Sequence, residues 1–215
     1  MAKRTETTIE LKPIQPKNLI ITIEGDTDLV LNKMNDVTTR ELINQRKDKA
    51  KSMEKPNVWE EIITSMHWYN GKPKEFSEET LKENLNPDVN APSISAFGFK
   101  QSFKDAVVRN QVDTYSTKFD AGVNIIAKGG LVPIQFAEHF IDEKLMSPKK
   151  GAPVLSRMNR FTGWSASIHV SMLDTVYSVE QVVNIINLAG FGLGIGSSRK
   201  SGYGRYHVVG LESVV

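Results

Sequence analysis

The sequence of residues 165–214 predicts a strand, a helix, a glycine-rich segment and a second strand, in that order. This order limits the topologies open to the chain. The run "SASIHVSM" alternates strictly, with apolar residues at every second position from Ala166 to Met172, as expected of a half-buried strand. Ser178 and Gln181 have capping-box spacing and predict the start of a helix. Its apolar stripe is Val179, Val182, Val183, Ile186 and Ala189. "GRYHVVGLESVV" then predicts a final strand, so a helix enters the glycine segment and a strand leaves it.

The glycine segment, residues 190–210, holds seven of the chain's fifteen glycines. Its first glycines recur at every second residue, a spacing that fits neither G-x-G-x-x-G nor the Walker A loop. Both of those phosphate loops also follow a strand and precede a helix, the reverse of the order here. Dinucleotide and nucleoside triphosphate binding of these types is therefore disfavoured.

Two interpretations of the segment stay open. Glycine can end a helix and let backbones pack closely. Alternatively, backbone amides can approach phosphate or sugar while arginine and lysine neutralise charge and tyrosine stacks on bases. The residues that favour this second interpretation are Gly194, Gly196, Ser198, Arg199, Lys200, Tyr203 and Arg205.

The remaining chain predicts a mixed α+β protein. "NLIITIEG" favours a strand, and Thr38 and Glu41 have capping-box spacing for a helix that Pro56 would end. Residues 72–92 are polar and contain prolines, which indicates a surface excursion, and a helix is predicted over residues 98–110. This order is compatible with a ferredoxin-like (RRM-like) βαββαβ core in one domain spanning residues 1–215, with an inserted helical and polar region at about 28–92.

Composition excludes several classes of function. The chain of 215 residues has no cysteine, so disulfides, thiolate metal sites and cysteine nucleophiles are ruled out. Its net charge is only +2, and any nucleic-acid surface must therefore arise from local clustering. No run approaches the roughly 18 apolar residues that cross a bilayer. We expect a soluble, cytoplasmic protein that needs no cofactor or metal.

The segment "GIGSSRKSGYGRYHV" resembles the C-terminal glycine-rich loop of the RAMP superfamily, which includes backbone subunits and crRNA-processing enzymes of CRISPR–Cas systems. "SISAFGFKQSFKDAVVR" is similar to the family's first-helix signature, with Lys100, Lys104 and Arg109 at its basic positions, although residues 93–96 lack the family's Pro-Gly-Ser-Ser lead-in. The match covers about residues 93–110 and 161–212. The whole chain also resembles small phage-encoded proteins of this type.

The resemblance implies a ferredoxin-like fold and non-catalytic binding of RNA or single-stranded DNA. It further implies a repeating subunit, in a homo-oligomer or a larger nucleoprotein complex. Besides the loop residues, Lys100, Lys104, Arg157 and Arg160 would line the groove for the strand. Arg157 and Arg160 are expected in a loop that leads into the strand beside the glycine segment.

Other functions remain open. A crRNA-processing type of metal-independent endoribonuclease would need a histidine, for which His169 and His207 are the candidates, although neither has a carboxylate at useful sequence spacing. Family members that cut target RNA use an aspartate after the first strand, where Asp26 and Asp28 stand here. A third alternative is a viral protein that interacts with or mimics CRISPR effector subunits.

Overall fold

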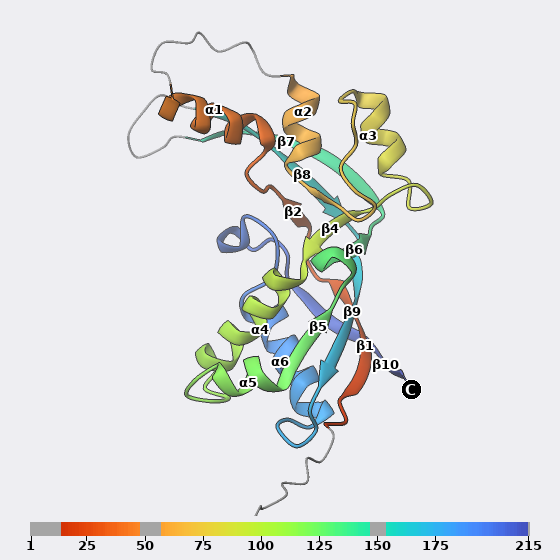
Figure 1. The fold of residues 1–215 in the computed structure, drawn as a ribbon, viewed down its shortest axis with the longest axis vertical. Coiled ribbons are helices and arrows are strands. Elements are labelled where there is room, and N and C mark those ends of the chain that lie inside the picture. Colours follow the sequence, from red (N-terminus) through yellow and green to blue (C-terminus); the bar gives the residue numbers. More distant parts are fainter. Residues whose placement is uncertain (1–13, 48–56, 147–153, 215) are drawn as a thin grey trace, which may run out of the picture.

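The computed structural model describes residues 14–47, 57–146 and 154–214. Four antiparallel strands lie in the order β10–β1–β9–β5, with two helices packed on one face (Figure 1). This is the strand order of a βαββαβ core, and the α+β, ferredoxin-like class predicted from the sequence is confirmed. In chain order the core consists of β1 (Lys17–Gly25), α4 (Ala96–Arg109), β5 (Val123–Ile126), β9 (Ser165–Met172), α6 (Val179–Gly192) and β10 (Tyr206–Val214).

The other elements lie between these core elements. β6 joins β9 beyond β5, and β4 and β3 extend the same sheet, whereas β2, β8 and β7 form a separate sheet next to α1 and α2 (Figure 1). Between β1 and α4 come β2 (Leu29–Leu31), α1 (Asp36–Lys47), α2 (Val58–Thr64), β3 (His67–Trp68), α3 (Glu78–Asn84) and β4 (Pro92–Ser95). The later elements are α5 (Thr117–Gly122), η1 (Lys128–Gly130), β6 (Leu131–Gln135), β7 (Glu138–Met146), β8 (Val154–Thr162) and η2 (Arg199–Ser201). No helix among the described residues is both long and apolar enough to cross a membrane.

The alternation predicted for β9 is confirmed, because its even-numbered apolar side chains are buried against the helices. Trp164, just before β9, is fully buried and donates its indole N–H to the Thr27 carbonyl at 2.8 Å. Gly25 at the end of β1 lies so close to this ring that a Cβ there would be 2.1 Å from Nε1. The tryptophan therefore fixes the end of β1 and the chain that follows it.

The two predicted capping boxes have different outcomes. The Ser178–Gln181 box is present, with both reciprocal hydrogen bonds at the start of α6. The Thr38–Glu41 prediction is wrong: α1 begins at Asp36, and the Asn35 side chain accepts the Thr38 N–H at 2.8 Å. Asparagine is among the strongest N-cap residues, so it starts the helix earlier. The predicted end at Pro56 lies outside the described residues.

Two segments contain regular elements that the sequence did not predict. Residues 72–92 contain α3, whose first turn is capped by the Ser77 hydroxyl. Arg157 and Arg160 lie within β8 and not in a loop, since β8 pairs with β7 along nine residues. Charged residues interrupt the apolar alternation of this hairpin, so its sequence does not show a strand pattern. Arg157 and Arg160 are accommodated because they form ion pairs with acids on the facing strand, on α2 and at Asp28.

Two glycines of α6 give a matched test of this packing. A Cβ at Gly190 would be 2.0 Å from the Tyr206 carbonyl oxygen, whereas a Cβ at Gly192 meets nothing within 4 Å. We expect Gly190→Ala to lower the free energy of unfolding by roughly 1–3 kcal/mol through overpacking. Gly192→Ala should leave it unchanged or raise it by up to about 1 kcal/mol, the helix propensity gained. Urea unfolding measures both, and equal effects of the two variants would contradict the packing described here.

Candidate nucleic-acid interface

The chain from Leu193 to Arg205, which we call the glycine loop, links α6 to β10 and lies against the connection between β1 and β2. Ser197 donates its backbone N–H to the Val30 carbonyl at 2.7 Å, and Gly204 donates to the Asp28 carbonyl at 2.8 Å. The Thr27 hydroxyl donates to the Gly202 carbonyl at 2.8 Å. The loop is therefore held at several points by backbone contacts that do not depend on its own side chains.

Three glycines permit this close approach. Gly194, Gly196 and Gly204 have positive φ values of +69°, +78° and +70°. A Cβ at Gly196 would be 2.6 Å from the Val30 carbonyl oxygen, and one at Gly204 would be 1.9 Å from that of Ile195. These glycines thus serve internal packing, the first of the two interpretations, and the Gly194 and Gly204 amides are bonded within the chain.

The cations at the tip of the loop are free of acids. Arg199 and Lys200 lie exposed in η2, and neither forms an ion pair with any residue in the described ranges. Ser198 before them is left-handed, with φ +56°, and η2 is right-handed. This succession turns neighbouring backbone N–H groups to one side, an arrangement that binds anions. Nothing in the described chain accepts a hydrogen bond from the N–H groups of residues 198–200.

Arg205 is held at the base of the loop. Its backbone N–H donates to the Thr27 hydroxyl at 3.0 Å, and its Nη2 reaches the Arg199 carbonyl at 3.5 Å. Nη1 is buried without a hydrogen-bond partner among the described residues. Tyr203 is half-buried and, with Ser198, lines a second cavity of about 280 Å³ on the side of β7 and β8. Arg205 therefore has unused hydrogen-bonding capacity beside the exposed cations.

Lys100 and Lys104 on α4 point to α5. Their ammonium groups lie 3.0 and 3.1 Å from the two carboxylate oxygens of Asp120, and Lys100 also contacts the Asn124 side chain at 3.0 Å. The hydrogen bonds from both lysines hold the pKa of the Asp120 carboxyl below its usual range. Both lysines are thus engaged within the fold, unlike the cations of the glycine loop.

Arg157 and Arg160 each bridge two acids. Arg157 contacts Glu143 of β7 at 2.8 Å and Glu61 of α2 at 3.2 Å. Arg160 contacts Asp142 and Asp28, both at 2.8 Å, and lies over the Phe140 ring at 4.7 Å from its centroid. Since the Asp28 carbonyl also accepts the Gly204 N–H, Arg160 connects the hairpin to the segment that holds the glycine loop.

A histidine–carboxylate pair escaped the sequence analysis. His207 Nδ1 lies 2.6 Å from the Asp26 carboxylate, a partner that sequence spacing did not reveal. Strand pairing places Glu24 opposite His207 and brings Asp26 close, across 181 positions of sequence. Asp26 also donates its backbone N–H to the Arg205 carbonyl, so the pair adjoins the glycine loop. Only the register of β1 and β10 could have revealed it.

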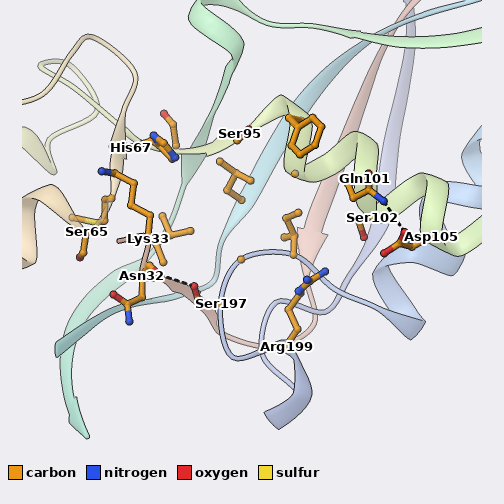
Figure 2. Close-up of a pocket in the computed structure, with 18 residues that line it drawn as sticks. Asn32, Lys33, Ser65, His67, Ser95, Gln101, Ser102, Asp105, Ser197 and Arg199 are labelled. Carbon is orange, nitrogen blue, oxygen red and sulfur yellow. Dashed lines mark hydrogen bonds between the residues drawn. The ribbon is translucent and has the colours of Figure 1, made fainter. Parts of the chain in front are cut away.

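A cavity of about 300 Å³ opens beside the glycine loop (Figure 2). Its walls come from the loop, the first turns of α4, β4, β3 and the chain after β2. The residues that matter below are Lys33, His67, Ser95, Phe97, Ser197 and Arg199. Of these, Arg199 alone was among the predicted binding residues, because Lys33 and His67 lie in segments without a recognisable motif. The described chain contains no group of three histidine or acidic side chains that could hold a metal ion.

No protein-family model matches this chain, and no curated protein matches it. Solved structures do resemble it. One is a chain in the cryo-EM structure of the Type III-B Cmr-beta bound to cognate target RNA. The alignment covers 93% of the present protein and 61% of the Cmr-beta chain, with a TM-score of 0.50 and 10% identity. The crystal structure of Cmr6 from Pyrococcus furiosus aligns with 92% of this chain and 100% of that chain, with a TM-score of 0.40 and 11% identity. The chain thus spans about three fifths of the length of the first of these, and its likeness to that structure is one of fold.

Proposed function

We propose that this protein binds single-stranded RNA or DNA through the glycine loop, without cutting it, as a repeating subunit of a larger nucleoprotein complex. The observation that carries the proposal is the contrast among its cations. Arg199, Lys200 and Arg205 have no acidic partner in the described part of the chain, whereas the predicted cations of α4 and β8 are paired with acids. The structure of the Cmr-beta relative, which contains target RNA, supports the same assignment.

The geometry explains how the loop would hold a strand. Its base is fixed by backbone hydrogen bonds, so its cations are presented with little entropy to lose on binding. Arg199 and Lys200 would contact phosphates, and the backbone N–H groups at Ser198 and after it would donate hydrogen bonds to the same phosphates. Tyr203 offers a face for stacking on a base. Such contacts are independent of sequence and sensitive to salt.

We propose that the paired cations make secondary contacts with the strand. Arg157 and Arg160 hold the β7–β8 hairpin beside the loop, and Lys100 and Lys104 would reach a phosphate if it displaced Asp120. Surface ion pairs contribute only about 0–1 kcal/mol, so exchange of a carboxylate for a phosphate is energetically accessible.

Replacing both tip cations tests the main assignment. Arg199→Ala with Lys200→Ala should weaken binding of an unstructured oligonucleotide and flatten its salt dependence. The slope of log K against log [salt] should fall by about 1.4, since each single-strand phosphate contact contributes about 0.7. Fluorescence anisotropy across a salt series measures this.

Lys74→Ala with Lys82→Ala is the matched control, because it removes the same charge from the exposed surface around α3. An equal change in both double variants, or an unchanged affinity in the first, would overturn the assignment.

The role of Lys100 and Lys104 has its own test. Asp120→Asn removes the carboxylate that both ammonium groups contact, and we expect the affinity for the oligonucleotide to rise about two- to threefold as they become available, of the order of one exposed ion pair. Asp174→Asn, which removes the carboxylate paired with Lys17, is the control for net charge. If Asp120→Asn and Asp174→Asn bind the oligonucleotide with equal affinity, Lys100 and Lys104 serve only to anchor α5.

A second candidate function, metal-independent cleavage of RNA, is favoured by the Asp26–His207 pair. A carboxylate on Nδ1 orients an imidazole so that Nε2 can take or give a proton, which is the arrangement of a general base. Incubation with a hairpin RNA in the presence of a metal chelator tests it. Cleavage that His207→Ala abolishes and His169→Ala retains would establish a nuclease, and an intact RNA would reject it.

A further inference from the structure

The cavity beside the glycine loop is bounded by parts of the chain that are far apart in sequence. The chain after β2 and β3 form one wall, and the glycine loop and α4 form the other (Figure 2). Its volume of about 300 Å³ is at the lower end of the range for small-molecule sites. A ligand the size of one nucleotide therefore suits it, whereas a duplex is far too large.

Lys33 supplies a cation to the first wall. Its side chain points up along the cavity near His67, and it forms no ion pair or side-chain hydrogen bond within residues 14–47, 57–146 and 154–214 (Figure 2). The nearby Asp36 carboxylate is bonded to Lys72. Burial lowers the pKa of the Lys33 ammonium, and the Lys72 charge lowers it further against the attraction of Asp36. A partly desolvated cation without a partner is costly to keep, which indicates that it serves an anion.

Arg199 supplies a second cation from the opposite wall. Its guanidinium projects from the glycine loop toward α4 (Figure 2). The Ser95 hydroxyl lines the cavity and makes no capping hydrogen bond to α4, so it is available to a ligand. The one carboxylate in the lining, Asp105, accepts a hydrogen bond from Gln101 at 2.8 Å. The cavity is therefore positive on two sides.

Phe97 gives the cavity an aromatic surface. It lies in the first turn of α4, and 75% of its side chain is exposed although it lines the cavity. Aromatic rings in this setting stack on nucleobases, and each stacked base contributes about 1–3 kcal/mol in single-strand complexes. Two cations, a free hydroxyl and an exposed ring together match the phosphate and the base of a nucleotide.

We propose that this cavity binds one nucleotide unit, with Lys33 and Arg199 on its phosphate groups and Phe97 stacked on its base. The unit is one residue of the strand held by the glycine loop, so the inference rests on the proposed function. A free nucleotide offers the same chemistry, and the experiment separates these two sources.

The first test is Lys33→Met, which removes the charge and retains the length of the side chain. We expect the affinity for an unstructured oligonucleotide to fall about tenfold, the effect of one charge-assisted hydrogen bond. The melting temperature should stay the same or rise, because a desolvated charge is removed. If Lys33 only supported the fold, its replacement would instead lower the melting temperature. Lys118→Met on α5 removes the same charge at a site where the ammonium lies over the Tyr177 ring, and should change the affinity less than twofold.

Phe97→Ala extends the test to the base. It should weaken binding of an ordinary oligonucleotide and leave binding of an abasic strand of equal length unchanged. Titration with a nucleoside monophosphate, followed by thermal stabilisation, supplies the second arm. Lys33→Met could abolish stabilisation by the monophosphate and leave the affinity for the oligonucleotide unchanged. That result would identify a free nucleotide as the ligand of the cavity and overturn the strand as its source.

The outcomes separate this inference from the proposed function. If the tip double variant weakens strand binding and Lys33→Met behaves like Lys118→Met in both arms, the cavity is no nucleotide site and the proposed function stands. If the tip variant leaves strand binding unchanged and stabilisation by the monophosphate still depends on Lys33, the cavity binds a free nucleotide through Lys33 and Phe97 without Arg199, and strand binding by the glycine loop falls.

Discussion

The close approach of three backbone segments holds the region around the glycine loop together. The glycine loop contacts the connection between β1 and β2, and it also folds back on itself where Ile195 donates its N–H to the Gly204 carbonyl at 2.9 Å. Side chains at Gly196 and Gly204 would separate these backbones. Because the contacts are made by main-chain groups, the side chains of the loop tip are left for other uses. The basic tip and one wall of the cavity depend on this arrangement.

The cations of this protein fall into two groups: some form ion pairs within the fold, and those of the loop tip do not among the described residues. Arg160 forms ion pairs with both Asp28 and Asp142 and so joins the second sheet to the segment under the loop. In the same region Asn159, fully buried on β8, donates to the Ile62 carbonyl and to the Ser65 hydroxyl of the chain around α2. These polar contacts fix the inserted elements against the core. The cations of the loop tip take no part in these contacts, and this division is the observation on which the proposed binding role of the tip rests.

Local patterns predicted the core well. The alternation of β9 and the capping box at Ser178 are short-range signals, and both appear in the structure because nothing distant competes with them. The β7–β8 hairpin and α3 were not predicted, since charged residues interrupt their strand and helix patterns. In the hairpin, Arg157 and Arg160 contact acids on the facing strand, on α2 and at Asp28. The site followed the same rule. Arg199 could be identified from its own motif, whereas Lys33 and the Asp26–His207 pair acquire meaning from contacts between distant segments.

Trp164 gives the loop region an optical property of its own. Its ring is buried with an edge-to-face contact to Tyr206, at 6.0 Å between centroids. Its indole N–H donates to the Thr27 carbonyl, in the connection between β1 and β2 that contacts the glycine loop. An indole in such a dry, hydrogen-bonded position emits at short wavelength, and water entering beside Thr27 would move the emission to the red. Of the chain's three tryptophans, Trp164 is thus the one hydrogen-bonded to the segment that contacts the glycine loop, and a variant that retains Trp164 alone would report on the seating of the loop without any added label.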